Sequence, residues 1–323
     1  MVNKKRQKRQ EIFHELAINL AFYTEGKIRQ RFACPFCLKL FDSIDQLSDA
    51  HIFPEALGGR TITLACKGCN SAIGSKIESY ETERVKFNDA FSGKGQNCWK
   101  VALTPKSDNV NSQNIGKVTA EMKLVENEAR TELQFHVTPK GYSPKALEEI
   151  SKLWGEAGSS VNVEFQARAG WTRGKLTYLH SAFLFLFSQF GYEWALDPCT
   201  QVIREQIQKP EEDLISFDPL ALAGSELTNH LPDGQAQISW YLITEPKESR
   251  GFLIVFSGLE HWSNPLGVWM PLFGCSYEPP KSINFCTLPL QTLRGHLSTF
   301  NFMYLGHQLV KRFFGKSETE NTK

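Results

Sequence analysis

Apolar side chains recur every three or four residues in several stretches of the chain, and this spacing predicts α-helices. The most apolar stretch is 174–190, where leucines and phenylalanines are spaced for burial on more than one side and Gly191 follows as a stop signal. Further helices are predicted over 12–31, 142–154 and 199–208. The helices at 174–190 and 199–208 are expected to form the core of a C-terminal unit.

Other stretches alternate between polar and apolar residues, which is the pattern of half-buried β-strands. Strands are predicted over 117–125, 130–137 and 161–167. The region 237–286 contains the runs ISWYLIT, GFLIVF and PLGVWMPLF, which are separated by polar turns and predict an antiparallel sheet. Residues 293–314 return to near-helical spacing. Together these patterns predict an α+β fold.

The segment 34–78 is predicted to contain shorter elements. Residues 50–53 read as a strand that Pro54 ends, and the glycine pair Gly58-Gly59 permits the positive-φ turn of a hairpin. Residues 62–65 read as the returning strand. From Cys69 the spacing becomes helical. The local prediction is therefore strand, turn, strand, helix.

Two C-x2-C pairs, Cys34/Cys37 and Cys66/Cys69, bracket this hairpin. Each pair can present two thiolates to one tetrahedral ion, and four sulfurs with no further ligand form a closed, structural zinc site. Disulfides are the alternative, but the chain shows no secretory signal, so we favour metal.

The same segment resembles the HNH endonuclease family, and in particular its zinc-stapled branch with an H-I-x-P-E-x-L-G-G stretch and a C-x2-C-N ending. Both features are present between His51 and Asn70, and the resemblance covers about 45 residues. It implies a ββα-metal module with a histidine on the first strand and an asparagine on the helix. Similar proteins are common in bacteria and phages, often in restriction, mobile-element or defence settings.

The resemblance implies that His51 is the general base that activates water and that Asn70 ligates a catalytic divalent ion. Phosphodiester hydrolysis needs these residue types. A histidine with an unperturbed pKa near ~6.5 accepts a proton at neutral pH. An asparagine oxygen suits a hard ion such as Mg²⁺ or Mn²⁺, which keeps coordination sites free for the phosphate.

One position departs from the family pattern. The residue before the base is usually an acidic metal ligand, and here it is Ala50. Asp49 lies one position further back, on the opposite strand face in regular extended geometry. A bulge could bring Asp49 to the ion, Glu78 could substitute for it, or the site is weakened; of these we favour Asp49. An asparagine often found before the third cysteine is also replaced, by Thr61 or Thr63.

Other interpretations of these residues stay open. His51 alone would more often be a packed strand histidine, although four cysteines and Asn70 beside it favour the base. Asn70 could be a helix N-cap instead of a ligand, and Glu78 is by default a solvated helix residue. The rival function is a catalytically weakened, zinc-containing nucleic-acid-binding module, which the replacement at Ala50 supports.

Charge constrains the partners. The net charge is only +1, so contacts with DNA, or with RNA as the alternative, must come from local patches. The N-terminal run is one such patch, either to grip phosphates or as a solvated start of a helix, with five cations in six positions: Lys4, Lys5, Arg6, Lys8 and Arg9. No apolar run approaches a membrane span. We expect a cytoplasmic protein without a membrane partner, and a homodimer or larger complex remains open.

The predicted organisation follows from these segments. A basic helix and the zinc-stapled ββα-metal module occupy 1–92, a mixed α+β domain of unknown role with antiparallel strands occupies 93–315, and 316–323 is a disordered polar tail. The predicted function is metal-dependent endonucleolytic hydrolysis of DNA.

Overall fold

The computed structural model describes residues 4–55, 59, 61–92, 98–105, 118–127, 130–142, 144–153, 161–165, 171–221, 237–243, 247–257, 265–275, 277–278 and 290–292. The chain divides into two compact units. The first combines Met1–Glu81 with Trp171–Lys323, and the second is Thr82–Gly170. The boundary at residue 81 falls inside a helix, α3 (Ser79–Ser92).

A β-hairpin followed by a helix forms the segment between the cysteine pairs. Strand β3 (Leu47–His51) pairs antiparallel with β4 (Thr61–Cys66), and α2 (Lys67–Ile73) continues through a π-helical turn (Gly74–Glu78) into α3. The pairing shifts between Ala50 and His51, because Ala50 lies opposite Thr63 and His51 opposite Thr61. The extra residue, Ile62, forms a bulge on β4. The predicted strand, strand, helix order is confirmed.

Gly59 is required because the backbone of Phe53 approaches it closely, and not because of the positive-φ turn that was predicted. Its φ is not in the left-handed region, but a Cβ at this position would lie 1.8 Å from the carbonyl oxygen of Phe53. Its N–H donates to the Pro54 carbonyl at 3.1 Å. A side chain would therefore force the connection away from the end of β3. Gly58 lies outside the described residues.

Helix α1 (Lys4–Tyr23) packs one face against the hairpin and buries Ile12, Leu16 and Leu20. It begins at Lys4, so the N-terminal cations belong to the helix, and it ends before the predicted limit at residue 31. Two short strands follow, β1 (Phe32–Ala33) and β2 (Leu40–Phe41), which form the small hairpin that carries the first cysteine pair.

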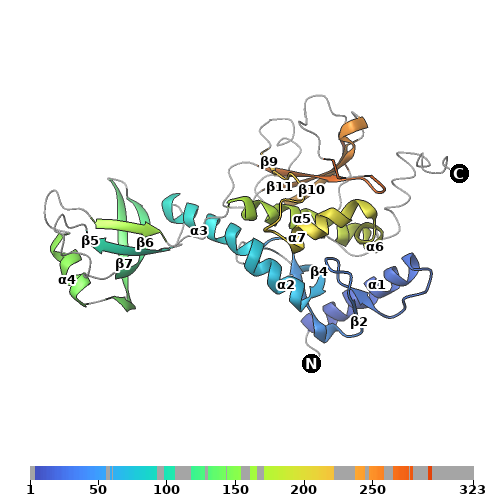
Figure 1. Ribbon diagram of the computed structural model, residues 1–323, viewed down its shortest axis with the longest axis horizontal. Helices are drawn as coiled ribbons and strands as arrows, with labels where there is room; N and C mark the ends of the chain where they lie inside the picture. Colours follow the sequence, from blue (N-terminus) through green and yellow to red (C-terminus); the bar gives the residue numbers. More distant parts are fainter. Residues whose placement is uncertain are drawn as a thin grey trace. The chain divides into compact units, whose positions relative to one another are not determined.

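Helix α5 (Trp171–Phe190) lies at the centre of the first unit, between the β3–β4–α2 segment and an antiparallel sheet (Figure 1). Its side chains from Leu179 to Phe187 are buried almost without interruption, as predicted for a helix that is apolar on more than one side. The sheet has the order β13-β10-β11-β12-β9. Its strands are β9 (Leu220–Ala221), β10 (Gln237–Ile243), β11 (Gly251–Ser257), β12 (Leu266–Pro271) and β13 (Leu290–Thr292).

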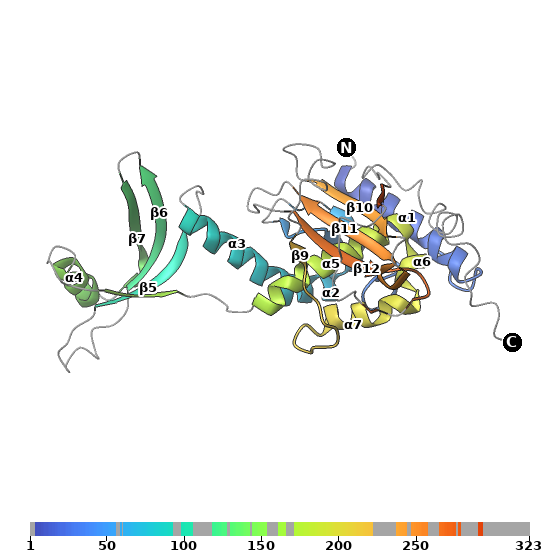
Figure 2. The ribbon, with the colours of Figure 1, turned by 90° about the horizontal axis from the view of Figure 1, so that it is seen from above.

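The hairpin segment and the C-terminal elements share one hydrophobic core. The Phe53 ring lies edge-on to Phe256 of β11, with 4.8 Å between ring centroids. Ser181 of α5 donates a hydrogen bond to the carbonyl of Ile52. Figure 2 shows β10, β11 and β12 lying across α5. The segment that carries His51 therefore depends on residues far along the chain for its packing.

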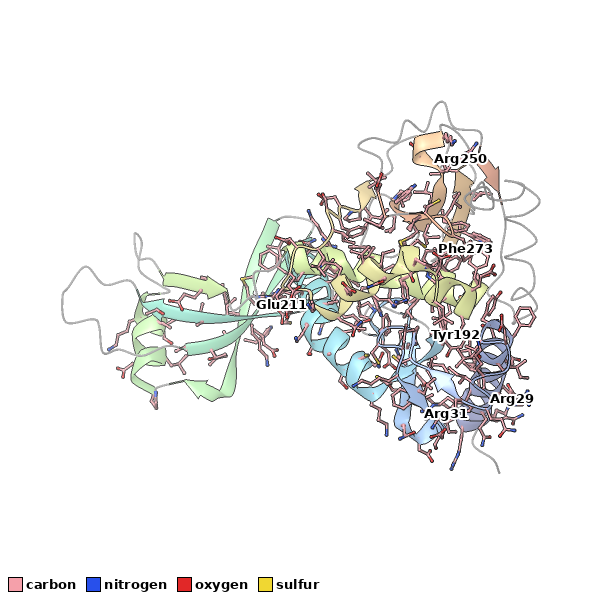
Figure 3. All side chains as sticks on the ribbon, turned by 45° about the vertical axis from the view of Figure 1, so that its right-hand side comes forward. Arg29, Arg31, Tyr192, Glu211, Arg250 and Phe273 are labelled. Atoms are coloured by element: carbon pink, nitrogen blue, oxygen red, sulfur yellow. The ribbon has the colours of Figure 1, made fainter. Side chains whose placement is uncertain are left out.

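Two short helices follow α5, namely α6 (Tyr192–Ala195) and α7 (Gln201–Gln208), and α6 contacts the N-terminal elements. The Tyr192 hydroxyl, labelled in Figure 3, donates to the Ala33 carbonyl at 2.5 Å and accepts from the Ala33 N–H at 2.8 Å. The Tyr192 N–H donates to Asn19 of α1 at 2.7 Å. Gly191 has φ 60°, and a Cβ there would lie 2.4 Å from the Asn19 side-chain oxygen. One residue thus ties α6 to both α1 and β1.

The second unit has its own antiparallel sheet, with the order β7-β6-β5-β8. Its elements are β5 (Trp99–Pro105), β6 (Val118–Asn127), β7 (Arg130–Tyr142), α4 (Pro144–Leu153) and β8 (Val161–Phe165). A separate core of Trp99, Val101, Leu103, Met122 and Ile150 holds these elements together. The strands and the helix predicted between 117 and 167 are confirmed.

The α+β fold class is confirmed, with the predicted module near the N-terminus and a strand-rich region after it. The grouping of residues differs from the predicted domains, because 171 onward packs with the module while 82–170 forms a unit of its own. The helix predicted at 293–314 and the tail at 316–323 lie outside the described residues. Among the described helices, none is long and apolar enough to cross a membrane.

Candidate metal centre and active site

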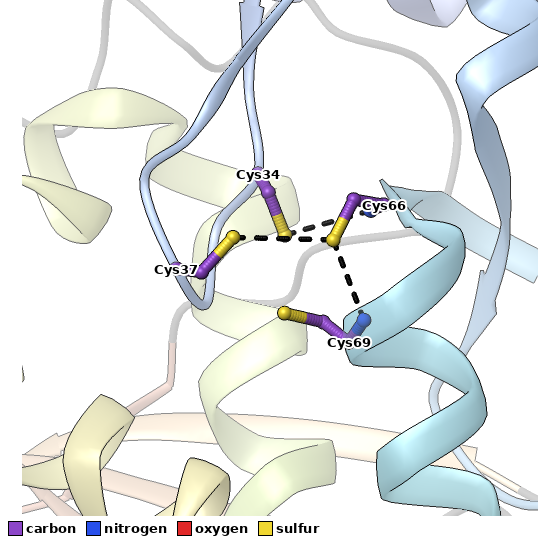
Figure 4. Close-up of side chains that lie close together, drawn as sticks. All are labelled: Cys34, Cys37, Cys66 and Cys69. Atoms are coloured by element: carbon purple, nitrogen blue, oxygen red, sulfur yellow. Dashed lines mark hydrogen bonds between the residues drawn. The ribbon is translucent and has the colours of Figure 1, made fainter.

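The four cysteine thiols converge on one point (Figure 4), and their sulfur atoms lie within 4.8 Å of one another. The first pair comes from the turn after β1, and the second pair from the end of β4 and the first turn of α2. Cys66 is the N-cap of α2, and its sulfur accepts a hydrogen bond from the Cys69 N–H at 3.3 Å. The C-x2-C spacing therefore coincides with a strand-to-helix junction, which directs both thiols to one side.

The sulfur geometry fits a tetrahedral zinc ion. Sulfurs at the corners of a tetrahedron with Zn–S of ~2.3 Å lie ~3.8 Å apart, and the Cys37 and Cys66 sulfurs are 3.9 Å apart. This separation is far from the ~2.05 Å of a disulfide bond, and all four cysteines are free. The cluster thus has the donor set and the geometry of a structural zinc site.

Hydrogen bonds within the cluster shift the pKa values of its thiols in opposite directions. Acceptance of a hydrogen bond from Cys34 lowers the pKa of Cys37 to about 6 and that of Cys66 to about 5. The pKa of Cys34 is raised because it donates to its neighbours and is buried. Thiolate character is what a zinc ion requires of its ligands. The lowered pKa values of Cys37 and Cys66 favour the thiolate form at these two positions.

Residues from the C-terminal part of the first unit hold the first cysteine pair in place. The Gln208 side chain of α7 donates to the Phe36 carbonyl at 2.9 Å, and the Phe36 ring stacks on His180 of α5 at 5.3 Å. Tyr192 holds Ala33, the residue before Cys34. The zinc-type site is therefore packed against α5, α6 and α7 as well as against its own hairpin.

His51 lies at the end of β3, directly after the bulge. Its Nε2 is 3.2 Å from the Thr61 hydroxyl, on the strand position opposite it. Nδ1 has no hydrogen-bond partner in the described part of the chain. Thr61 thus holds the ring by one nitrogen, and the other nitrogen keeps its hydrogen-bonding capacity.

Asn70 is the fourth residue of α2. The alternative that it caps the helix is wrong, because Cys66 is the N-cap. Its side-chain Nδ2 donates to the main-chain carbonyl of Asp49 at 3.2 Å, which joins the helix to the strand that carries His51. The structure thus brings Asn70 to β3, as a strand-and-helix site requires.

The Asp49 carboxylate faces cations of α1. Lys5 Nζ lies 3.0 Å from one carboxylate oxygen and Arg9 Nε 3.3 Å from the other, and the Asp49 side chain is 11% exposed. Arg6 lies 3.9 Å from Asp45. Lys4 and Lys8 are exposed. The predicted cation patch is therefore partly engaged by carboxylates of the module itself.

Glu78 lies in the π-helical turn and faces the interior. Its carboxylate is 3.7 Å from Nδ1 of His180, and burial raises the pKa of Glu78 to about 7. Burial lowers the pKa of His180 to about 3. Among the described residues, neither His180 nitrogen has a hydrogen-bond partner. Glu78 is therefore part of the packing against α5 and is not the solvated residue that the sequence suggested.

Apart from the four cysteines, the described residues contain no group of three or more histidine, cysteine or carboxylate side chains close enough to share an ion. The roles of His51, Asn70 and Asp49 remain predictions.

Comparison with known proteins supports the same segment. Residues 34–85 match a family model described as HNH endonuclease, which confirms the resemblance over this part of the chain. No curated protein and no solved structure matches the chain. The match supports nuclease activity, and such an activity implies a nucleic-acid substrate.

Sequence reasoning missed three features around this site. Thr61 was noted only as a replacement for asparagine, yet it contacts His51. The pairing of Lys5 and Arg9 with Asp49 had one signal, their i,i+4 spacing on a helix that places both on one face. Nothing in the sequence pointed to His180 as the neighbour of Glu78.

Proposed function

We propose that the protein is a metal-dependent HNH endonuclease that hydrolyses phosphodiester bonds in DNA. His51 is the general base that activates water, and Asn70 is a ligand of a catalytic Mg²⁺ or Mn²⁺ ion. The observation that carries the proposal is the match of residues 34–85 to the HNH family. The β3–β4–α2 arrangement supports it, since it joins the His51 strand to Asn70 through one hydrogen bond.

The residues have separate tasks. A divalent ion at this site, when bound, supplies positive charge for the phosphate and the leaving oxygen. Asn70 offers its side-chain oxygen to that ion, since its Nδ2 is taken by Asp49. His51 accepts the proton of the attacking water at Nδ1, while Thr61 holds Nε2. The cysteine cluster takes no part in the chemistry and holds the module together through zinc.

The exposed cations of α1 extend the site to the substrate. Lys4 and Lys8 face solvent at the start of α1. Each phosphate that they neutralise adds salt-dependent affinity without sequence preference.

Purified protein incubated with supercoiled plasmid and Mg²⁺ or Mn²⁺ tests the proposal directly. Conversion to nicked or linear DNA is expected, and His51→Ala should lower the rate by ~10²–10⁴-fold while DNA binding, zinc content and melting temperature stay at the wild-type level. Single-stranded RNA of matched length is the substrate control. A His51→Ala protein that cleaves at the wild-type rate would contradict the assignment.

The rival function is nucleic-acid binding without cleavage. It is favoured by Ala50, which replaces an acidic residue, and by Asp49, which is already paired with two cations. A plasmid that shifts in a gel but stays supercoiled at all concentrations of Mg²⁺ and Mn²⁺ would select this alternative.

A further inference from the structure

We propose that Asp49 is a positioning residue for Asn70 and does not ligate the catalytic ion. Its carboxylate anchors β3 to helix α1, and its main-chain carbonyl orients the Asn70 amide. The inference rests on the proposed role of Asn70 as an ion ligand.

The Asp49 carboxylate is already neutralised within the protein. Lys5 and Arg9, one helical turn apart, approach its two oxygens at 3.0 and 3.3 Å, and only 11% of the side chain is exposed. An ion that took this carboxylate would lie beside both cations, which repel it. Oδ1 and Arg9 Nε form this ion pair without a hydrogen bond, so charge alone holds that oxygen beside the cations of α1.

Arg9 extends the same anchor along the chain. Its guanidinium donates to the carbonyls of Ile44 and Leu47, at 3.0 and 2.8 Å, just before and at the start of β3. One side chain therefore holds the beginning of β3 through two carbonyls and its third residue through a carboxylate. These contacts fix the position of the Asp49 backbone relative to α1.

The backbone of Asp49 then determines which atom Asn70 offers. Asn70 Nδ2 donates to the Asp49 carbonyl at 3.2 Å. A carbonyl oxygen can only accept, so the NH₂ end of the amide must face it and Oδ1 must point away from it. Oδ1 accepts no hydrogen bond from any described residue. Oxygen is also the atom that hard divalent ions select.

The direction in which ion affinity changes when a cation partner of Asp49 is removed separates a positioning residue from a ligand. If Asp49 ligated the ion, removal of its cation partners would free the carboxylate and tighten ion binding. If Asp49 positions Asn70, removal of Arg9 loosens the support and weakens binding. Asp49→Asn weakens binding in both cases, so the cation variants carry the test.

The experiment measures Mn²⁺ binding by electron paramagnetic resonance, without nucleic acid, to the full chain with its zinc. Arg9→Gln and Asp49→Asn should each weaken Mn²⁺ binding by about tenfold, the scale of outer-sphere ligand support. The double variant Arg9→Gln/Asp49→Asn should bind Mn²⁺ no more weakly than the weaker-binding of the two single variants. Lys8→Gln, which removes an exposed cation of the same helix, measures the general effect of one lost positive charge.

Each outcome decides between the alternatives. If Arg9→Gln bound Mn²⁺ more tightly than Lys8→Gln does, the positioning role would be overturned. The same conclusion would follow if the two variants bound Mn²⁺ equally well. If Arg9→Gln does not fold, the Mn²⁺ affinity of Lys5→Gln is compared with that of Lys8→Gln instead, since the Lys5 side chain is 74% exposed. Wild-type protein that binds no Mn²⁺ would instead overturn the ion-binding role of Asn70 and with it this inference. Zinc content and melting temperature of every variant identify loss of fold.

Discussion

The cysteine cluster and the His51–Asn70 pair lie on the same hairpin and helix, yet they differ in completeness. The cluster brings four like ligands together, with all sulfurs within 4.8 Å of one another and the Cys37–Cys66 pair at 3.9 Å. The His51–Asn70 pair offers one imidazole nitrogen and one amide oxygen, and each side chain is already bound on its other side, to Thr61 and to Asp49. The first site is closed, and the second keeps positions open.

This difference matches the tasks that the two sites are proposed to perform. A structural ion needs all of its ligands from the protein, whereas a catalytic ion must leave coordination positions for water and phosphate. A site with few protein ligands is therefore compatible with catalysis. Its weak point is orientation, because each remaining ligand must be held by its neighbours.

Loss of one cluster thiol should have the largest effect. Cys66→Ser removes a ligand and the N-cap of α2 together, and we expect the first unit to lose more than about 4 kcal/mol of unfolding free energy. Thermal melts and zinc analysis measure the effect. Cys275→Ser, on an exposed cysteine outside the cluster, is the control. A Cys66→Ser protein that kept its melting temperature and its zinc would show that the cysteine cluster is not a closed structural site.

Glu78 tests whether the catalytic site has a ligand further along the helix. The pKa of its buried carboxyl is raised from 4.5 to about 7, so the folded state binds the proton more tightly than the unfolded state does. This contribution to stability is complete below pH 4.5 and is lost as pH rises through about 7, which amounts to about 3 kcal/mol.

Glu78→Gln, which is neutral at every pH, should therefore be more stable than wild type at pH 8 and should lose most of that advantage towards pH 5. Melting curves at the two pH values, with the Mg²⁺ concentration needed for half-maximal cleavage, measure both effects. A large increase in that Mg²⁺ concentration would show that Glu78 is a ligand.

Asn70→Ala should raise the Mg²⁺ concentration for half-maximal cleavage by about tenfold or more, since the change removes the one protein ligand assigned to the ion. Asn70→Asp keeps an oxygen and should bind the ion better than alanine does. Ser71→Ala, on the exposed neighbouring position of α2, controls for changes in the helix. An Asn70→Ala protein with the wild-type Mg²⁺ dependence would contradict the assignment.

Thr61→Val should have the smallest effect. It removes the hydroxyl that holds His51 Nε2 but keeps the shape of the side chain, so we expect cleavage to slow by about three- to tenfold, the value of one hydrogen bond. The Mg²⁺ dependence should not change. Single-turnover rates measured at saturating Mg²⁺ check this, and a rate equal to wild type would mean that Thr61 does not orient the base.

The sequence predicted what depends on neighbours along the chain. The hairpin, the helix that begins at the second cysteine pair and the convergence of four thiols all follow from spacing within 34–78, and the structure contains each of them. The partners of the site were not predictable in this way. His180 at Glu78, Tyr192 at Ala33 and the cations of α1 at Asp49 are brought there by tertiary packing, which leaves no local pattern.

The division into compact units also differs from the predicted boundary near residue 92, for the same physical reason. A charged helix followed by polar residues looks like the end of a domain, and 82–170 does form a compact unit with its own core. However, the helix that covers the hairpin begins only at Trp171, beyond that unit. Sequence periodicity predicted α5 correctly as a buried helix, but it carries no information about which surface buries it.

The contact between Tyr192 and the first cysteine pair has a consequence for the order of biosynthesis. A ribosome releases the hairpin and all four cysteines first, then the whole of 82–170, and only afterwards α5 and Tyr192. Helix α1 precedes the hairpin and can cover part of its apolar surface at once, but the part that packs against α5 and the C-terminal sheet has no cover until those elements have been translated. A product of premature termination in 82–170 would therefore carry the cysteines without the α5 side of their core, and the segment with His51 and Asn70 would complete its packing only late in translation.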